Sequence, residues 1–432
     1  MRLAGSTAAR VGGAAVAMIV VAELAIWLLS PRDEPPEPLP VTEQDYFVGA
    51  ELDRAHAYRD GQRWLLLAGL GIEGAVLLAV ALGRPAPVRR GLARLAARPI
   101  LGAAVAGTGV AVLTSAATLP TRLVAHERAV DAGLSSQSLG PWLWDVARST
   151  GISAVLTAAG AALLMALIRR VPRAWWLPGA ALAGALAVIF VWIAPVVLAP
   201  IFNRFEPLPD RSPTRTEVLA LGERAGVEIG EVYRVDASRR VTSLNAYVGG
   251  LGPTKRVVLY DNLLAEADRE EVASVVAHEL GHVAHDDIPR GLAYILIVAP
   301  LGMLFTRELG NSLARWGGAD PATPAAIPAY LFALSLATLV LTVPGNQLSR
   351  KVEASADAFA LELTNDPRAL IDLQLRLART NLSDPDPPGL YSALFATHPP
   401  TVERIGAALA YEREGDAEAA TSRVSRPETN PQ

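Results

Sequence analysis

The sequence predicts a mainly α-helical protein, a polytopic membrane bundle of about seven spans joined to a water-facing domain with a small β-sheet. Three observations predict this. Of the 432 residues, 51% are apolar and only 19% are charged, and the mean hydropathy is +0.29. Seven apolar segments are close to the length that a helix needs to cross the hydrocarbon core. One long stretch between them is richer in charge and contains short runs of valine and tyrosine.

The seven apolar segments fall into two groups. Five precede residue 202, and two follow the charged stretch. The sixth, Leu292–Phe305, is short and contains Pro300, so the pattern allows six or seven spans. The first is too long for a signal peptide, contains Glu23 and lacks a small-residue cleavage site, so we expect it to span the membrane. The segments are Val11–Leu29, Trp64–Leu82, Ile100–Leu119, Ile152–Ile168, Trp176–Leu198, Leu292–Phe305 and Ile327–Val343.

The charged stretch between Phe202 and Pro289 has the pattern of a water-facing domain. Asp268 and Glu271 form a capping box, which opens a helix that continues to Asp286. The other expected helices are Arg215–Ala225, Asn346–Leu363 and Thr364–Ala410, the last broken at Asp384–Pro388. The expected strands are Glu231–Val235, Ala246–Gly249 and Arg256–Tyr260.

These elements predict three parts. Residues 1–201 form an N-terminal membrane domain with five transmembrane helices. Residues 202–411 form the second domain, interrupted by a transmembrane hairpin at about 291–345. From residue 412 onward the chain is polar and has no apolar period, so we expect 412–432 to be a disordered tail.

Composition excludes several classes of function. The net charge of −4 argues against nucleic acid as the main partner. The chain has no cysteine, which excludes disulfides, thiolate metal sites and cysteine nucleophiles. Of the 39 basic residues only Lys255 and Lys351 are lysine, which indicates a GC-rich, bacterial genome.

The strongest chemical signal is the H-E-L-G-H segment at His278–His282. Residues four apart lie on one face of a helix, so His278 and His282 can bind a single Zn²⁺. The ion would lower the pKa of a bound water toward ~7, and Glu279 would take its proton and pass it to the leaving amine. Charged residues open this helix, so it lies in or near water rather than within a span. We therefore expect one Zn²⁺ per chain and a hydrolytic reaction.

A catalytic zinc usually has three protein ligands, and two residues compete for the third place. His285 follows His282 by three residues, but one helix rarely wraps three ligands around a tetrahedral ion. Glu353 lies on another helix, with Asp357 four residues later on the same face. Glu353 would bind the metal while Asp357 holds the outer nitrogen of a ligating histidine. The alternative is that these two acids belong to a solvated charged face.

Several short motifs occur in order along the chain, and together they resemble the Ste24-type CaaX prenyl proteases of the M48 family, which are relatives of the HtpX membrane proteases. The resemblance extends from about Arg122 to Arg404. It implies an integral-membrane zinc metalloendopeptidase with a gluzincin-like domain. The matching pieces are Ser135–Asp145, Phe202–Leu208, Asn245–Val248, Arg256–Asp261, His278–His282, the E-x-x-x-D of Glu353–Asp357 and the H-P of His398–Pro399.

The resemblance also implies roles for single residues. Glu353 corresponds to the third zinc ligand and Asp357 to the acid behind a ligand. His398 corresponds to a histidine that stabilises the tetrahedral intermediate or the substrate. The alternative is that His398 has only a structural role, as a residue held in place at the start of a loop. Arg404 would pair with Asp357 or with a substrate group. Asn245 and its strand, including Tyr247, would hold the substrate by strand addition.

The expected partners are the lipid bilayer and peptide or membrane-protein substrates, with the protein functional as a monomer. Two substrate classes remain open, which are CaaX-type processing and quality control of membrane proteins. The alternative functions are a polytopic transporter and a non-proteolytic membrane chaperone with a zinc site. The pair Glu353 and Asp357 argues against the transporter, and the presence of Glu279 argues against the inactive chaperone.

Charge in the loops predicts the orientation of this multi-pass cell-membrane protein. Arginines crowd residues 84–98 and 169–173, and acidic residues crowd 33–53. Arginine-rich loops stay in the cytoplasm, which places the catalytic domain outside after five spans. The resemblance to the eukaryotic members of the family implies the opposite orientation, in which the catalytic domain faces the cytosol.

Overall fold

The computed structural model describes residues 2–32, 35–83, 86–250 and 255–424, and the chain divides into two compact units. The unit called here the membrane unit comprises Met1–Leu29, Asp60–Val196 and Pro289–Gly345. The unit called here the sheet unit comprises Ser30–Arg59, Val197–Ile288 and Asn346–Gln432. The late apolar pair thus groups with the first five segments. Residues 30–59, which the sequence places in the membrane domain, group with the sheet unit instead.

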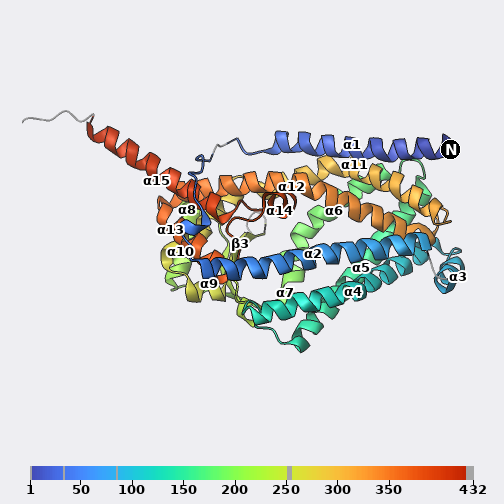
Figure 1. Ribbon diagram of the computed structural model, residues 1–432, viewed down its shortest axis with the longest axis horizontal. Coiled ribbons are helices and arrows are strands. Elements are labelled where there is room, and N and C mark those ends of the chain that lie inside the picture. Colours follow the sequence, from blue (N-terminus) through green and yellow to red (C-terminus); the bar gives the residue numbers. More distant parts are fainter. Residues whose placement is uncertain (1, 33–34, 84–85, 251–254, 425–432) are drawn as a thin grey trace, which may run out of the picture. The chain divides into compact units, whose positions relative to one another are not determined.

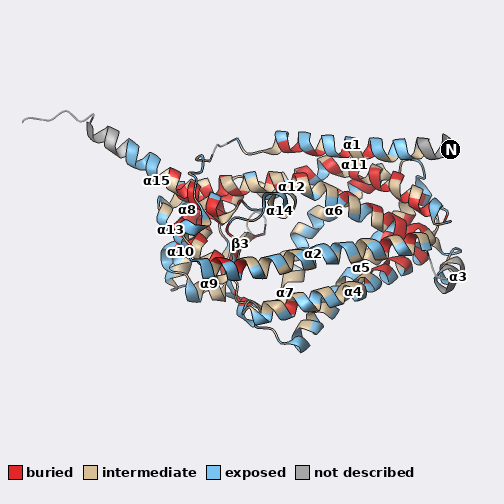
Figure 2. Ribbon diagram, viewed as in Figure 1, coloured by how far each residue is buried: buried red, intermediate tan, exposed pale blue. Residues whose placement is uncertain are grey.

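Seven helices in the described ranges are long and apolar enough to cross a membrane, which confirms the prediction of about seven spans (Figure 1). Large apolar side chains on them are exposed, such as Trp27 at 80% and Trp192 at 64% (Figure 2). Such surface suits a lipid environment, where the helix satisfies its own backbone. The helices are α1 (Arg2–Leu29), α2 (Gly49–Gly83), α4 (Pro99–Asp131), α5 (Leu139–Arg170), α6 (Trp176–Ile193), α11 (Asp287–Trp316) and α12 (Ile327–Thr364), with the short α3 (Ala86–Arg94) after α2.

Small residues allow the spans of the membrane unit to pack closely. A Cβ atom on Gly107 of α4 would lie 2.8 Å from the carbonyl oxygen of Thr157 on α5. The hydroxyls of Ser115 and Thr150 join the same two helices at 2.6 Å. Small residues and hydroxyl hydrogen bonds are the usual means of helix association in lipid, where apolar burial supplies no driving force.

The two late spans differ from their predicted form. α11 has 30 residues rather than the 14 of Leu292–Phe305, and it continues through Pro300. α12 has 38 residues and runs without a break from the span through the predicted amphipathic helix, with Pro344 inside it. A proline removes one helical hydrogen bond and bends the axis, and a long apolar helix can tolerate that loss. Glu353 and Asp357 therefore lie on the continuation of a membrane helix.

The sheet unit contains a four-stranded sheet in the order β1-β2-β4-β3. The strands β2 (Glu231–Val235), β3 (Ala246–Gly249) and β4 (Arg256–Tyr260) have the predicted bounds, and β1 (Phe205–Pro207) was not predicted because it is only three residues long. β2 and β4 are parallel, and β3 pairs antiparallel with β4. Among the strands of the described residues, β3 is consequently an outer strand with one edge free of strand partners.

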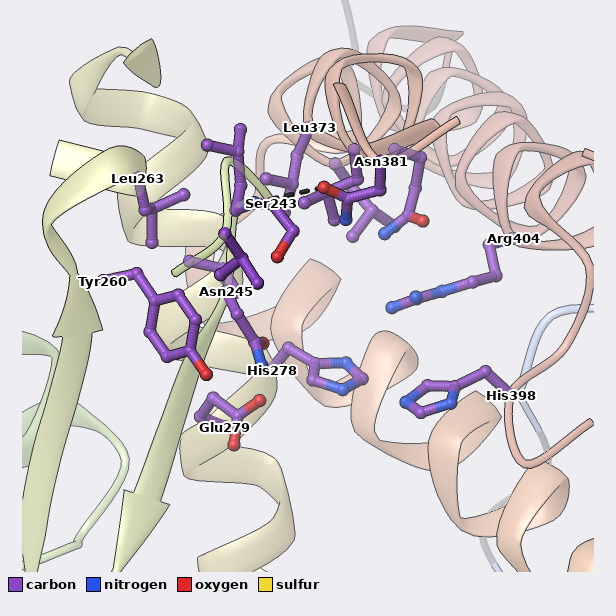
Figure 3. Close-up of a pocket in the computed structure, with 16 residues that line it drawn as sticks. Ser243, Asn245, Tyr260, Leu263, His278, Glu279, Leu373, Asn381, His398 and Arg404 are labelled. Carbon is purple, nitrogen blue, oxygen red and sulfur yellow. Dashed lines mark hydrogen bonds between the residues drawn. The ribbon is translucent and has the colours of Figure 1, made fainter. Parts of the chain in front are cut away.

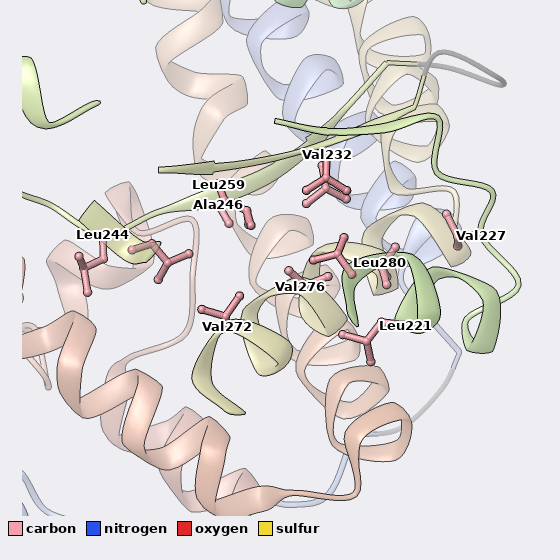
Figure 4. Close-up of a cluster of buried hydrophobic side chains, with 12 residues drawn as sticks. Leu221, Val227, Val232, Leu244, Ala246, Leu259, Val272, Val276 and Leu280 are labelled. Carbon is pink, nitrogen blue, oxygen red and sulfur yellow. The ribbon is translucent and has the colours of Figure 1, made fainter. Parts of the chain in front are cut away.

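Helices cover the sheet and supply its core. Val232 and Leu259 of the sheet are fully buried together with Val276 and Leu280 of α10 (Arg269–Ala284) and Leu221 of α8 (Pro213–Arg224) (Figure 4). The predicted capping box is present at the start of α10. The other helices of the sheet unit are α7 (Ala199–Phe202), α9 (Asp261–Glu266), α13 (Pro367–Thr380), α14 (Gly389–Phe395) and α15 (Thr401–Val424).

The polar end of the chain is partly helical. α15 continues to Val424, although the sequence was expected to be disordered from residue 412. Alanine and glutamate are frequent in residues 412–424, and both favour helix without needing a packed face. The last part of the predicted tail, 425–432, lies outside the described residues.

Candidate active site

The core under the sheet determines which way the H-E-x-x-H segment points. Val272, Val276 and Leu280 recur every four residues on α10 and are buried in that core (Figure 4). His278 and His282 lie on a different face of the helix. Their imidazoles point toward α12, where they meet Glu353.

A glycine within the motif brings α10 and α12 together. A Cβ atom on Gly281 would lie 3.2 Å from Cα and 3.3 Å from the carbonyl oxygen of Ala356, which is fully buried on α12. Glycine has no Cβ, so it permits this approach of one backbone to another. The short separation allows the carboxylates of Glu353 and Asp357 to reach the histidines of α10.

Three side chains converge as metal ligands would. Nε2 of His278 lies 3.2 Å from Oε2 of Glu353, and Nε2 of His282 lies 3.6 Å from Oε1 of the same carboxylate. The side chains of His278 and Glu353 are 8% and 10% exposed. Oε2 of Glu353 is buried without a hydrogen-bond partner. A buried carboxylate whose two oxygens each face an imidazole nitrogen fits a cation, and a set of two nitrogens and one carboxylate fits zinc.

The outer nitrogens of both histidines are held by carboxylates. Nδ1 of His278 lies 2.8 Å from Oδ1 of Asp357, and Nδ1 of His282 lies 2.9 Å from Oδ2 of Asp287. Arg404 donates two hydrogen bonds to Asp357, at 2.7 and 2.6 Å. A histidine whose Nδ1–H is donated to a carboxylate presents a lone pair at Nε2, so both rings are oriented as ligands.

The acids around His278 also determine its protonation. Burial lowers the pKa of His278, but the hydrogen bond and charge of Asp357, together with Glu353, outweigh it and raise this pKa to about 10. A cation that binds at Nε2 must therefore displace a proton.

Glu279 lies beside these three side chains, and one of its carboxylate oxygens is within 4.8 Å of ligand atoms of His278 and His282. Burial raises the pKa of Glu279, although His278, His282 and the backbone N–H of Val248 act against the shift. That N–H belongs to β3 and lies 3.3 Å from Oε2 of Glu279. A buried carboxylate with a raised pKa accepts a proton more readily than an exposed one, as a general base must.

A cavity of about 430 Å³ opens over these residues within the sheet unit. Asn245, Glu279, His398 and Arg404 are among its lining residues (Figure 3). Nε2 of His398 lies 3.3 Å from Oε2 of Glu353, so this histidine reaches the group from the side opposite α10. The structure thus brings together residues that lie more than 150 positions apart in the sequence.

Two candidate residues lie away from the group. The ring of Tyr247 packs with Phe205 and Tyr233 on the other face of the sheet and does not line the cavity. His285 ends α10, where its Nδ1 lies 3.2 Å from the hydroxyl of Ser355 and its ring meets the edge of Phe359. Between the two candidates for the third ligand, the geometry favours Glu353.

Comparison with known proteins identifies the family. The model of peptidase family M48 matches residues 213–412, and the model described as CAAX prenyl protease N-terminal, five membrane helices, matches residues 36–204. An uncharacterized metalloprotease of Bacillus subtilis, YhfN, is 30% identical over 301 residues, which cover 68% of this chain and 70% of that protein. The chain belongs to peptidase family M48. It is a multi-pass membrane metallopeptidase.

Other relatives of this M48 peptidase carry a more specific name. A CAAX prenyl protease 1 homolog of Arabidopsis thaliana is 32% identical over 64% of this chain and 65% of that protein. The CAAX prenyl protease 1 of Saccharomyces cerevisiae is 32% identical, and the chain spans about half of its length, at 52%. The crystal structure of S. mikatae Ste24p superimposes with a TM-score of 0.69 over 92% of this chain and 98% of that one, at 19% identity, and so shares the fold.

Sequence reasoning about this M48 peptidase missed Asp287. The predicted helix ran through Asp286, and the sequence assigned no role to the acid that follows it. In the structure Asp286 has φ of 55°, in the left-handed region, and α11 begins at Asp287. This turn brings the Asp287 carboxylate back to His282. An acid five residues after a ligating histidine was the available signal, but the sequence does not show where the chain turns.

Proposed function

We propose that this M48 peptidase is a zinc endopeptidase in which Glu279 is the general base. The convergence of two Nε2 atoms on the two oxygens of the buried Glu353 carboxylate, with Glu279 alongside, carries the proposal. His278, His282 and Glu353 would hold one zinc ion. When bound, the ion supplies a polarised water and a Lewis acid for the substrate carbonyl.

The protein's own groups complete the reaction. Glu279 takes a proton from the attacking water and passes it to the leaving amine. Asp357 holds His278 in the tautomer that leaves Nε2 free, and Arg404 fixes Asp357 by two hydrogen bonds. Of the two roles weighed for Arg404, the geometry supports the pairing with Asp357. His398 faces the cavity, where it would donate a hydrogen bond to the substrate carbonyl oxygen as charge develops there.

The free edge of β3 would bind the substrate. β3 is the outer strand beside β4, and its Val248 N–H faces Glu279 rather than another strand. An extended peptide added along this edge would place a peptide bond near the general base. Asn245, which lines the cavity just before β3, would contact the same peptide. Tyr247 faces the other side of the sheet and would contribute through its backbone alone.

The substrates would be peptides or segments of membrane proteins. Strand addition recognises the peptide backbone and tolerates different side chains, which suits quality control of membrane proteins. The relatives named CAAX prenyl proteases make a prenylated C-terminal peptide the second candidate. Purified protein with zinc should be offered a farnesylated C-terminal peptide and its unprenylated counterpart. We expect cleavage of both, and a zinc-loaded protein that cleaves neither would overturn the proposal.

The arginine-rich loops support a catalytic domain on the extracytoplasmic side. The test is a reporter fused after Gln432 that is active in only one compartment. Native substrates would appear as membrane proteins that accumulate in cells carrying Glu279→Gln in place of the wild type.

A further inference from the structure

The end of α13 is held by a side chain from the distant start of α2. Arg59 donates from Nε to the carbonyl oxygen of Leu382 at 2.7 Å and from Nη2 to that of Asn381 at 2.6 Å. These residues belong to the sheet unit although they are more than 320 positions apart in the sequence. One turn earlier on α2, Nε2 of His56 lies 3.3 Å from Oδ1 of Asp384, in the same loop.

The turn that Arg59 holds is unusual. α13 ends at Thr380, and Leu382 has φ of 44°, in the left-handed region that costs a residue with a side chain about 1–2 kcal/mol. The N–H of Ser383 returns to the carbonyl of Ala378 at 2.9 Å, which closes the helix end. The carbonyls of Asn381 and Leu382 have no later helical turn to bond them, so a guanidinium that donates to both stabilises this conformation.

The same turn places a side chain at the active-site cavity. Oδ1 of Asn381 accepts the backbone N–H of Leu244 at 3.1 Å, and both residues line the cavity (Figure 3). Leu244 directly precedes Asn245 and β3. Arg59, Asn381 and Leu244 therefore form a continuous series of hydrogen bonds from α2 to the start of the outer strand.

We propose that Arg59 is a positioning residue for substrate binding, which acts through Asn381 on the segment Leu244–Asn245. The proposal rests on the proposed function, because it takes the edge of β3 as the place where the peptide lies. The hydrogen bonds that link these three residues run through backbone groups and the Asn381 side chain, and not through His278, His282 or Glu353. Loss of Arg59 should therefore loosen the entrance to β3 and weaken peptide binding, with kcat and zinc content preserved.

The first test is kinetic. We expect Arg59→Ala to raise KM by about tenfold with little change in kcat, because misplacement of a binding edge costs affinity before it costs chemistry. Asn381→Leu should have the same effect, and the double variant should be no worse than either single one, because the two act in series. Asn381→Asp keeps the acceptor oxygen and should stay close to the wild type. Arg63→Ala, which removes an arginine of the same helix paired with Asp60, is the control.

The second test does not depend on catalysis. In Arg59→Ala the backbone amide of Leu244 should exchange its hydrogen at least about tenfold faster than in the wild type, while amides in the core of α10 stay unchanged. Wild-type hydrolysis with an unchanged KM in a folded Arg59→Ala would refute the positioning role alone, as would unchanged exchange at Leu244. If the wild type cleaves no peptide, the proposed function fails, and faster exchange would still establish the link from Arg59 to the cavity.

Discussion

Two groups of histidine and acidic side chains in the described part of the chain are alike in composition and differ in arrangement. Each places three potential ligand atoms within 4.8 Å of one another, and in the active-site group these belong to His278, Glu279 and His282. In the active-site group two imidazoles present Nε2 to Glu353, and each donates its Nδ1 side to a separate aspartate. The other group consists of Glu43, His56 and Asp384.

In the second group one imidazole serves two acids. Nε2 of His56 lies 3.3 Å from both Glu43 and Asp384, and the His56 side chain is 37% exposed. Both carboxylates face the same nitrogen of His56, so the arrangement is that of an ion pair in which a single imidazole nitrogen is engaged by two acids. In the active-site group two separate Nε2 atoms face one carboxylate, and an aspartate holds the outer nitrogen of each ring. The comparison shows that residue types alone do not make a metal site. The second ring nitrogen of each histidine must also be held by another group, so that the first nitrogen is directed at the metal.

The largest expected effect is on kcat, and it should follow a change in the active-site group but not in the group around His56. Glu279→Gln should lower kcat by about 10²–10⁴-fold, because the amide cannot take a proton from water. Zinc content should stay at one ion per chain. Glu43→Gln, the matched change in the other group, should leave kcat within about twofold. Peptide hydrolysis together with metal analysis checks both, and near-normal turnover of a zinc-loaded Glu279→Gln would refute the assignment of the base.

Metal content gives the next contrast. His278→Ala should weaken zinc binding by more than about 100-fold, since loss of a ligand exceeds the usual effect of losing a residue behind a ligand. His56→Ala should keep one tightly bound ion, as we expect of the wild type. A chelator should remove zinc and activity from the wild type, and added zinc should restore both. If the wild-type chain binds two ions and His56→Ala binds one, the group of Glu43, His56 and Asp384 is a second metal site.

Variants of Asp287 test whether zinc binding requires a carboxylate at the outer nitrogen of His282. Asp287→Ala should lower zinc affinity by about 10–100-fold, because the His282 ring loses its orientation. Asp287→Asn keeps an acceptor for Nδ1–H and should lose much less. Asp286→Asn is the control, because asparagine tolerates the left-handed backbone at that position. Competition with a chromophoric chelator measures the affinities, and equal values for all three variants would refute the role of Asp287.

The smallest expected effect concerns the close approach that assembles the active-site group. Gly281→Ala adds a Cβ at 3.2 Å from the Ala356 backbone, which costs about 1–3 kcal/mol of overpacking against about 1 kcal/mol gained in helix propensity. We expect a net loss of about 1 kcal/mol and weaker zinc binding. Gly291→Ala on α11 meets nothing within 4 Å and should be neutral or stabilising. Thermal unfolding of both variants provides the measurement, and a more stable Gly281→Ala would contradict the packing argument.

Local patterns accounted for much of the fold. The bounds of β2, β3 and β4 and the capping box of α10 follow from short runs of valine and tyrosine and from two acids three residues apart. The short β1, the continuity of α12 through Pro344 and the helical end of α15 were missed. A proline or a polar run lowers helix stability locally, whereas neighbouring turns decide whether the helix continues.

The residues of the candidate site divide in the same way. The sequence by itself determined His278, Glu279 and His282, because helical periodicity alone places them on one side of α10, and it marked Glu353 with Asp357 by the same four-residue spacing. Only the tertiary structure decided that His285 turns to Ser355, that Tyr247 faces away from the cavity, that Asp287 meets His282, and that Arg59 meets the end of α13. These outcomes depend on a left-handed turn, on which face of the sheet is covered, and on a contact across more than 320 residues. Such features arise from packing between elements, and no local pattern in the chain encodes them.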